Sequence, residues 1–373
     1  MARIGGLELE VGVPIPSPRP YSYRNKMEFS FGTSRWLSRD EIESGRPLDK
    51  GFALGLHVPG RFDKLVDLKE CFLQSSLSAR IVNRVREIAR SQGWSAYNSR
   101  AHRGFLKNLV LRSSEATGEI LAALVTTRFH EGRMEILGSA LADEFKEIVS
   151  LVNAVNETRS PVAQGEEKII YGSGEITETI RDLSFRISLT SFFQPNTLQA
   201  ERLYFLIQEL LEPRGSELLF DIFSGVGCIG LFMASSVKKV VGFENNPGSV
   251  ENAQENAREN GVENIAFQVA DATEALSQES LQAFGHPDKV VLDPPRAGLN
   301  NRLIGRLLEA QPRQILYVSC NPATQARDIA GLTSRYQVTA VQPLDMFPQT
   351  PHIECAVRLD RIEKKVAVPA TGS

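Results

Sequence analysis

From about residue 190 onward, apolar and β-branched runs alternate with helical patterns, and this alternation constrains the fold more than any other feature. The runs are hydrophobic throughout, as strands are when helices cover both faces of a sheet. Strand–helix–strand repeats of this kind predict a doubly wound α/β domain with a mostly parallel sheet. We expect strands at 218–222, 239–243, 265–269, 290–292 and 315–318, and helices beginning near Thr197, Gly227, Pro247, Ala272, Asn300 and Pro322.

Two further strand patterns, at 336–343 and 352–359, have no helix between them. They can therefore pair antiparallel. A seven-stranded sheet whose last strand is antiparallel is typical of Rossmann-like class I methyltransferases, whereas dinucleotide-binding folds are all parallel. The segment from Arg361 to Ser373 has no hydrophobic pattern, and we expect it to be a mobile tail.

The first half of the chain has a different pattern and predicts an α+β domain. Short strand patterns at 26–32, 52–58, 108–112, 120–127 and 134–137 are separated by turn residues. One helix is expected from Leu77 to Gln92, where the apolar residues form a single stripe. The sequence thus predicts a first domain at 1–189, a second at 190–360 and a tail at 361–373.

The two halves carry opposite charge. Residues 1–112 contain 19 Lys and Arg against 11 Asp and Glu, a net charge of +8, whereas the remainder contains 23 against 34, a net charge of −11. A basic domain joined to an acidic one is typical of a polyanion-binding module attached to a catalytic module. An Arg-rich solvated surface explains the charge equally well, so charge alone leaves both interpretations open.

Composition excludes several classes of protein. The chain has 373 residues, 42% of them hydrophobic, which suits a globular protein of two domains. No stretch approaches the roughly 20 apolar residues of a membrane-spanning helix, and MARIGGLELEVG has no apolar run long enough for a secretory signal. The four cysteines are widely spaced and form no CxxC pair, which argues against disulfides and zinc. We expect a cytoplasmic monomer that binds neither membrane nor metal.

The stretch ELLFDIFSGVGCIGLFMA puts Gly225, Gly227 and Gly230 between a strand and a helix. Glycine lets the backbone turn tightly and approach a ligand without a Cβ in the way. A plain tight turn is the simpler explanation. The next strand, however, ends at Glu244, where a carboxylate can accept hydrogen bonds from both ribose hydroxyls of a nucleotide. We therefore favour nucleotide binding.

Two further acids follow strands of the expected sheet. Asp271 can contact an adenine amino group or cap a helix from Ala272, and the sequence favours neither. Asp293 opens DPPRAG, where Pro294 and Pro295 impose an extended loop. Such a loop can be purely structural, but open α/β sheets bind ligands at the carboxyl ends of their strands.

Cys320 ends a strand and precedes Asn321 and Pro322, which predict a helix N-cap and a first helical position. A thiol beside a helix N-terminus should have a pKa below its free value of roughly 8.5. Most lone buried cysteines are inert packing residues. The position of Cys320 at a strand's carboxyl end, near the DPPR loop, favours a chemical role instead.

In the last strand pattern, PHIECAVRL, apolar residues alternate onto one face and leave His352 and Glu354 on the other. Because both faces of the sheet should be covered, Glu354 needs either a salt-bridge partner or a chemical role, and we favour the role. Upstream, TSFFQPN leads into the helix from Thr197. Asn196 can cap that helix, and Gln194 can reach the amino-acid part of a cofactor.

Five motifs together resemble the RNA 5-methyluridine methyltransferase family, over nearly the whole chain from YRNKMEFSFG onward. They are FFQPN at 192–196, DIFSGVGCIG at 221–230, DPPRAGL at 293–299, SCNP at 319–322 and FPQTPHIEC at 347–355. The resemblance implies an S-adenosylmethionine-dependent enzyme that methylates carbon 5 of a uridine in RNA. It implies that Cys320 is the nucleophile and Glu354 the base, and that the cofactor and uracil sites are lined by Gln194, Phe223, Glu244, Asp271 and Asp293.

The segment LGLHVPGRFDKLVDLKECFLQ resembles the branch of the family that acts on large-subunit ribosomal RNA. Members of that branch usually carry an iron–sulfur cluster and often an N-terminal β-barrel RNA-binding domain. Cys71 matches the last cluster cysteine, but the three earlier positions would precede Met1, so the sequence predicts no cluster in this chain. We expect ribosomal RNA to be the substrate, with transfer RNA as the alternative.

Three other functions are compatible with parts of this sequence. A methyltransferase acting on an exocyclic nitrogen or a small molecule would share the glycine loop but would not need a thiol near DPPR. A nicotinamide dehydrogenase is disfavoured by the antiparallel last strands. A catalytically silent RNA-binding protein would use only the basic half of the chain.

Overall fold

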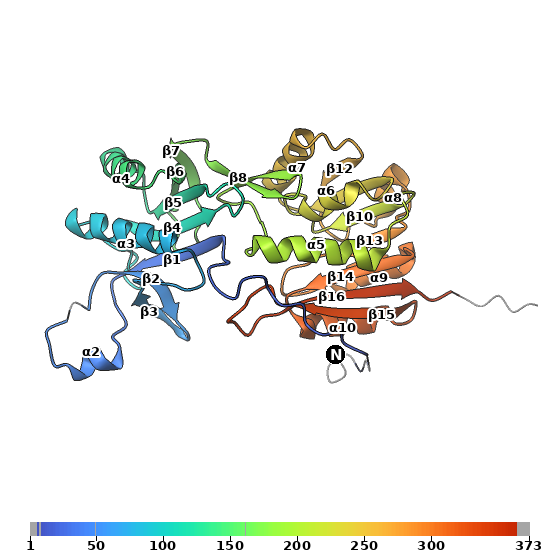
Figure 1. Cartoon of the computed structure of the whole chain (residues 1–373), viewed down its shortest axis with the longest axis horizontal. Coiled ribbons are helices and arrows are strands. Elements are labelled where there is room, and N and C mark those ends of the chain that lie inside the picture. The colour runs from blue at the N-terminus through green and yellow to red at the C-terminus, as the bar shows by residue number, and fades with distance from the viewer. Residues whose placement is uncertain (1–5, 7–8, 49, 161, 364–373) are drawn as a thin grey trace, which may run out of the picture. The chain divides into compact units, whose positions relative to one another are not determined.

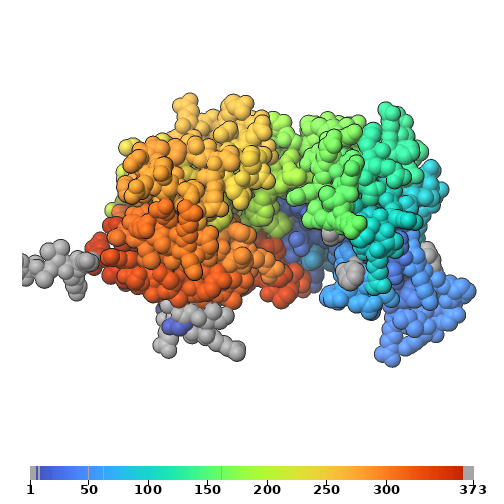
Figure 2. Space-filling view, turned by 180° about the vertical axis from the view of Figure 1, so that it is seen from behind, coloured from blue at the N-terminus to red at the C-terminus, as the bar shows by residue number. Residues whose placement is uncertain are grey.

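The computed structural model describes residues 6, 9–48, 50–160 and 162–363. The described residues form two compact units. In Figures 1 and 2, residues 19–198 run from blue to green and residues 199–363 from yellow-green to red, whereas the described residues before 19 are dark blue. Residues 19–198 make up the 19–198 unit. Residues 199–363, together with the described residues before 19, make up the 199–363 unit. The predicted mobile tail lies mostly outside the described residues, although Arg361 belongs to the last strand.

The 199–363 unit contains the predicted doubly wound sheet, with strand order β12-β11-β10-β13-β14-β16-β15. Five strands are parallel, and β16 pairs antiparallel with both β14 and β15, as expected. The strands are β10 (Leu218–Ile222), β11 (Lys239–Glu244), β12 (Ile265–Val269), β13 (Lys289–Leu292), β14 (Gln314–Ser319), β15 (Tyr336–Leu344) and β16 (Glu354–Arg361).

Helices cover both faces of this sheet. On one face, Phe220 and Val241 of the sheet pack in a core with apolar residues of α8, α9 and α10. On the other, Gly230 of α6 lies against the side chains of Val240 and Ile265. The helices are α5 (Thr197–Leu211), α6 (Cys228–Ala234), α7 (Pro247–Glu259), α8 (Gln278–Phe284), α9 (Asn301–Ala310) and α10 (Pro322–Leu332).

One predicted helix begins later than expected. Residues 272–276 form turns, and α8 starts only at Gln278, with Ser277 accepting a hydrogen bond from the N–H of Ser280 as its N-cap. The side chain and carbonyl of Asp271 accept from Thr273 and Glu274, which closes a turn before a helix can begin. The interpretation of Asp271 as a helix cap is therefore wrong.

The 19–198 unit is an α+β structure with a second seven-stranded sheet, in the order β3-β2-β1-β4-β5-β6-β7, and a separate β8–β9 hairpin. Helices α3 and α4 lie against this sheet (Figure 1), and their apolar residues are buried in one core with it. The elements are β1 (Lys26–Gly32), α2 (Arg39–Glu43), β2 (Ala53–Val58), β3 (Arg61–Asp67), α3 (Ser76–Ser91), β4 (Leu106–Ser113), β5 (Ile120–Thr126), α4 (Glu131–Glu144), β6 (Ile148–Val155), β7 (Glu166–Tyr171), β8 (Glu175–Ile180) and β9 (Leu183–Ser188).

The strand expected at 134–137 is wrong, because these residues lie within helix α4. Met134, Leu137, Gly138 and Leu141 are the buried residues of that helix. Their spacing of three and four residues is the helical period, and the four-residue window from Met134 was too short to reveal it.

The first described residues cover the edge strand of the 199–363 sheet. The N–H of Gly12 donates to the carbonyl of Val341 at 2.8 Å, and that of Ile15 donates to Pro343 at 3.0 Å. The N–H of Asp345 donates back to Ile15 at 2.9 Å. Edge strands expose unpaired backbone groups, so residues 12–15 shield part of β15.

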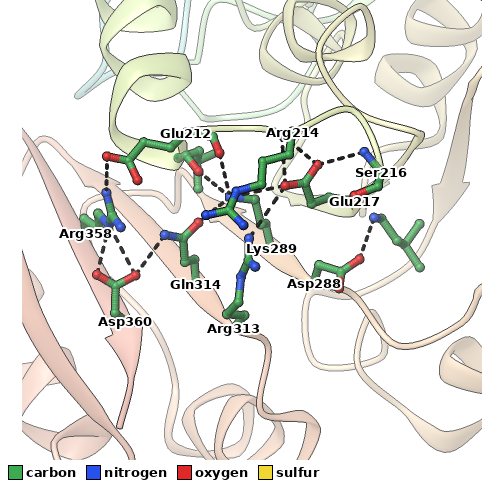
Figure 3. A network of polar contacts seen from close by, with 12 residues as sticks. Glu212, Arg214, Ser216, Glu217, Asp288, Lys289, Arg313, Gln314, Arg358 and Asp360 are labelled. Carbon is green, nitrogen blue, oxygen red and sulfur yellow. Dashed lines mark hydrogen bonds and ion pairs between the residues drawn. The ribbon is translucent and has the colours of Figure 1, made fainter. Parts of the chain in front are cut away.

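A network of polar side chains links strands β13, β14 and β16 at the amino end of β13 (Figure 3). The buried ammonium of Lys289 donates to the carbonyl of Leu211 and to the Gln314 side chain. The amide of Gln314 in turn donates to Asp360 at 2.9 Å, and Asp360 pairs with Arg358 at 3.0 Å. The network lies at the end of the parallel strands opposite to the candidate site described next.

None of the helices in the described ranges is long and apolar enough to cross a membrane.

Candidate active site

The predicted site residues of the 199–363 unit gather where its parallel strands end. Phe223 follows β10, Glu244 ends β11, Asp293 follows β13 and Cys320 follows β14. Parallel neighbours end at the same edge of a sheet, and open α/β sheets bind ligands at that edge. Gln194 belongs to the other unit, where it is buried and its backbone carbonyl accepts from the Asn25 side chain at 2.8 Å.

The loop between β10 and α6 has the backbone that its glycines predicted. Gly225 and Gly227 have φ angles of +54° and +86°, in the left-handed region that favours glycine. A Cβ at Gly227 would lie 2.5 Å from the ring of Phe267. Phe223 also has a positive φ, of +71°, which is a strained conformation for a bulky residue. The loop thus holds a turn that other residues would strain, and Gly227 packs too closely against Phe267 to carry a side chain.

Glu244 holds this loop from the neighbouring strand. One carboxylate oxygen accepts from the N–H of Gly225 at 3.2 Å, and the other accepts from the N–H of Asn246 at 2.9 Å. Each oxygen of a carboxylate has two acceptor sites, so both can still accept a ligand hydroxyl. The carboxylate is half-buried beside the loop, where the sequence predicted a ribose-binding acid.

Asp271 stays ionised at the end of β12. Its carboxylate accepts from the hydroxyl of Thr273 at 2.7 Å and from the Thr273 N–H at 2.9 Å. These two hydrogen bonds lower the pKa of Asp271 below its ordinary value. The residue therefore offers a fixed negative charge and an acceptor to a bound ligand.

Asp221 is a buried acid to which the sequence analysis assigned no role. One carboxyl oxygen accepts from the N–H of Gly230 at 2.9 Å, whereas the other has no hydrogen-bond partner among the described residues. Burial raises the pKa of Asp221 to about 7, and the charge of Asp293 adds to the shift. Asp221 thus holds the start of α6 from within β10, and its second oxygen is a buried acceptor that the described residues leave unsatisfied.

The DPPRAGL loop is fastened to helix α10. The side chain of Asn321 donates to the carbonyl of Arg296 at 3.1 Å, and Asp328 accepts from the N–H of Leu299 at 2.7 Å. Asp328 also accepts from the hydroxyl of Tyr317 in β14 at 2.8 Å. The loop, the helix and the strand that precedes Cys320 are therefore held together by one buried carboxylate.

Gly298 allows the DPPRAGL loop to lie close enough to Asp328 for these hydrogen bonds to form. Its φ is +77°, and a Cβ at this position would lie 2.3 Å from the carboxylate of Asp328. The sequence contained the glycine, but its partner Asp328 could be found only from the packing of α10.

Cys320 and Glu354 meet at the ends of neighbouring antiparallel strands. The last pair in the β14–β16 register is Ser319 with Cys355. In an antiparallel pair, the next residue of one strand lies opposite the preceding residue of the other. Cys320, which follows Ser319, therefore lies opposite Glu354, which precedes Cys355. The charge of Glu354 acts directly on the thiol, and so does that of Asp293.

The environment of Cys320 corrects one expectation. As predicted, the thiol precedes a helix whose N-cap is Asn321 and whose first residue is Pro322. Its pKa is nevertheless raised, because the half-buried sulfur is desolvated and because Glu354 and Asp293 are negative. Arg296 opposes this shift with its positive charge. The helix is adjacent to Cys320 in the sequence, whereas the two carboxylates come from other parts of the chain.

Glu354 is 3% exposed, and no Lys or Arg among the described residues forms an ion pair with it. Burial raises its pKa well above the ordinary value, and Asp293 raises it further. A carboxylate with a raised pKa is a better proton acceptor than an ordinary one. This environment disfavours the structural salt bridge that the sequence left open.

Arg296 is a second residue to which the sequence analysis assigned no role, although it lies within the DPPRAGL motif. Its guanidinium is 3.2 Å from Nδ1 of His352, which precedes Glu354 on the loop into β16. Arg296 thus brings a positive charge to the thiol and contacts the segment that carries the buried acid.

The described residues contain no group of three or more His, Cys, Asp or Glu side chains that could hold a metal ion, and the four cysteines are free thiols. Cys71 is partly buried against the core of the 19–198 unit.

Comparison with known proteins gives matches over most of the chain. A family model described as tRNA (uracil-5-)-methyltransferase matches residues 117–362. A protein from Bacteroides thetaiotaomicron, described as an uncharacterized RNA methyltransferase, is 38% identical over 365 residues, covering 96% of this chain and 80% of that protein. A protein of the same description from Chlorobaculum tepidum is 39% identical over 345 residues, covering 91% and 71%.

Among solved structures, the tRNA (uracil-54, C5)-methyltransferase of Pyrococcus abyssi is similar to this chain. It was solved in complex with S-adenosyl-L-homocysteine. The two share 32% sequence identity, with a TM-score of 0.77 over 96% of this chain and 80% of that one.

Proposed function

The chain belongs to the RNA uracil-5 methyltransferase family, and from that premise we propose that it methylates carbon 5 of one uridine through Cys320 as covalent nucleophile and Glu354 as base. The observation that carries the proposal is the meeting of these two residues at the ends of β14 and β16. One is a thiol, and the other is a buried acid without an ion pair among the described residues.

The chemistry explains why both groups are needed. Carbon 5 of uracil is too weak a nucleophile to take up a methyl group unaided. Addition of the Cys320 thiolate to carbon 6 forms a sulfur–carbon bond and turns the ring into an enolate whose carbon 5 can attack. After methyl transfer, Glu354 removes the proton from carbon 5, the double bond re-forms and the sulfur–carbon bond breaks, which frees Cys320.

The pKa shifts of the two residues fit these roles differently. The raised pKa of Glu354 strengthens it as the acceptor of the carbon 5 proton. The raised pKa of Cys320 works against its ionisation, and Arg296 counteracts that shift. We infer that Arg296 stabilises the thiolate, which is the reactive form.

S-adenosylmethionine supplies the electrophilic methyl group when it is bound. The tight turn at Gly225 and Gly227, at the carboxyl end of β10, and the half-buried carboxylate of Glu244 beside it support the binding of such a ligand. We propose that Glu244 accepts hydrogen bonds from its ribose and that Asp271 contacts the adenine side. The remaining residues proposed for the cofactor and uracil sites are Gln194, Phe223 and Asp293.

The RNA substrate is proposed from sequence resemblance and charge. The segment 54–74 resembles the ribosomal-RNA branch, so ribosomal RNA is the first candidate. Transfer RNA is the second, because the similar Pyrococcus abyssi enzyme acts on it. We assign RNA binding to the basic first domain, 1–189, and methyl transfer to 190–360. The free cysteines support action in a reducing compartment such as the cytoplasm. We also propose that the protein acts as a monomer.

A trapping experiment with RNA containing 5-fluorouridine tests the mechanism. Fluorine replaces the proton that the base must remove, so the wild-type protein should form a stable methylated adduct that survives denaturing electrophoresis. Cys320→Ala should form no adduct and no product. Cys71→Ala, a matched loss of a thiol in the other unit, should behave like the wild type.

The same assay with ordinary RNA separates the two catalytic residues. Glu354→Gln keeps the shape of the side chain but cannot accept the proton, so a methylated RNA–protein adduct should accumulate and should vanish when Cys320→Ala is added. Wild-type turnover by Glu354→Gln, or a stall without any adduct, would contradict the role of Glu354. Supplying ribosomal and transfer RNA from a strain lacking the enzyme identifies the substrate.

A further inference from the structure

The 19–198 unit contains a hollow of about 840 Å³ that belongs to none of the catalytic residues. Four segments line it. They are residues 30–34 at the end of β1 and just after it, the turn between β2 and β3, the turn at 97–100, and the start of β4. This volume is in the range of pockets that hold drug-sized ligands. The residues of its walls decide which ligand it suits.

An aromatic ring and a buried cation lie together in the wall. The ammonium of Lys107 is 4.8 Å from the centroid of the Tyr97 ring. Lys107 is 4% exposed, and it donates to the Asn156 side chain at 3.2 Å and to the carbonyl of Thr158 at 2.6 Å. Burial lowers the pKa of Lys107. Tyr97 itself is partly exposed, so its ring, with a cation at one face, is fixed beside the hollow.

Two guanidinium groups share one carboxylate at the same hollow. Asp63 pairs with Arg61 at 3.3 Å and with Arg100 at 2.8 Å. The side chains of both arginines are at least half exposed, with values of 50% and 69%. The lining thus includes three Lys or Arg side chains, those of Arg61, Arg100 and Lys107, and one acidic side chain, that of Asp63. An anion near the arginines would therefore meet a net positive charge.

The rest of the lining is rich in small polar groups. The side chain of Asn98 donates to the Thr33 hydroxyl at 2.9 Å, and that of Asn108 donates to the Ser30 hydroxyl at 3.2 Å. Amide and hydroxyl groups held in place in this way can exchange hydrogen bonds with the edge of a heterocyclic base.

We propose that this hollow binds one unpaired nucleotide of the substrate RNA, other than the methylated uridine, with its base at Tyr97 and its phosphate at Arg61 and Arg100. An aromatic ring for the base, guanidinium groups for the backbone and fixed polar groups for the base edge are the elements that recognise single-stranded RNA. The inference rests on the proposed function, since it takes RNA to be the substrate.

The test measures RNA affinity in the full-length protein. Tyr97→Leu should weaken binding of the substrate RNA by about five- to a hundredfold, the usual effect of losing one stacked base, whereas Tyr97→Phe should bind like the wild type. The double variant Arg61→Gln/Arg100→Gln should lose at least about tenfold and show a shallower salt dependence. Arg39→Gln/Arg46→Gln, which removes two exposed arginines elsewhere in the same unit, is the charge-matched control.

Two further readouts separate this site from the catalytic chemistry. S-adenosylmethionine affinity and the 5-fluorouridine adduct at saturating RNA should be unchanged in the Tyr97 and Arg61/Arg100 variants. If the wild type methylates RNA and these variants bind it normally, the nucleotide site is refuted. If the variants lose affinity while the wild type neither methylates nor traps RNA, the site stands and the proposed chemistry fails. Tighter binding of free uridine or adenosine monophosphate than of RNA would refute an RNA site.

Discussion

At the scale of single residues, Glu244 has two tasks that must be separated in any test. It holds the N–H groups of Gly225 and Asn246, and it is the proposed acceptor for the ribose of S-adenosylmethionine. A hydrogen bond to a charged group contributes about 1.5–3 kcal/mol, so losing even one ribose contact should weaken binding about tenfold.

We therefore expect Glu244→Ala to bind S-adenosylmethionine at least about tenfold more weakly than the wild type in isothermal calorimetry. Glu244→Gln, which retains an acceptor but not the charge, should have an affinity between those of the wild type and Glu244→Ala. Glu251→Ala removes an exposed acid from helix α7 and serves as the control. Unchanged affinity in Glu244→Ala, with the fold intact by circular dichroism, would end the assignment.

The residue scale also shows where sequence reasoning stops. The pairing of β14 with β16, which brings Cys320 and Glu354 together, was not predicted, although the strand end at Cys320 and the last strand around Glu354 could be predicted. The direction in which the pKa of Cys320 shifts could not be predicted, because it depends on two carboxylates and one guanidinium that other parts of the chain bring to the sulfur. The position of Cys320 in the sequence predicted only the effect of the following helix N-terminus on its pKa.

At the scale of elements, helix α10 positions the DPPRAGL loop through Asp328. This carboxylate is 1% exposed and accepts from the Leu299 N–H and the Tyr317 hydroxyl. Leaving a buried donor without a partner costs about 1–3 kcal/mol. Two such donors would be left by Asp328→Ala.

Asp328→Ala should therefore lower the free energy of unfolding by about 3 kcal/mol and the Tm by roughly 5–10 °C in calorimetry. Its kcat should fall as well, because the loop that carries Asp293 and Arg296 loses its attachment. Glu309→Ala, which removes an exposed acid from the neighbouring helix α9, should leave both quantities near wild type. A normal Tm for Asp328→Ala would show that the loop is held by other contacts.

The sequence predicted the parallel strands well, because each is a mostly apolar run flanked by helical patterns. The strands at 218–222 and 265–269 have the expected bounds, and α5 begins at Thr197 as expected. Short windows were ambiguous, as Met134 to Leu137 shows, because a few apolar residues fit either period. The start of α8 depended on the turn that Asp271 closes, which a helical pattern alone does not reveal.

At the scale of the whole molecule, Lys289 links stability to pH. Burial lowers its pKa to about 8, Arg313 adds to this effect and Glu217 opposes it. An unfolded lysine has a pKa of about 10.4, so between these values the unfolded chain binds more protons than the folded one. Stability contributed by this residue should therefore rise with pH in that range, by up to about 1.4 kcal/mol per pH unit.

The comparison of wild type with Lys289→Met isolates this contribution. Removal of the Lys289 ammonium leaves the carbonyl of Leu211 and the side-chain oxygen of Gln314 without a donor. The variant should therefore be less stable than the wild type at every pH in this range. The gap in Tm between the two proteins should widen from pH 7.5 to 9.5, as measured by differential scanning calorimetry. Lys238→Met, which removes an exposed lysine, should follow the wild-type slope. A constant gap would mean that Lys289 keeps its proton across this range.

The pairing of residues 12–15 with β15 has a consequence for biosynthesis. Gly12 and Ile15 are translated before the whole 19–198 unit, whereas their partners Val341 and Pro343 follow that unit and most strands of the 199–363 sheet. Until then the early segment has no partner in this sheet, while the intervening 19–198 unit is already available to fold. Closure of the 199–363 unit is consequently a late event, so a ribosome that stalls before residue 341 would release a chain whose first segment still lacks its strand.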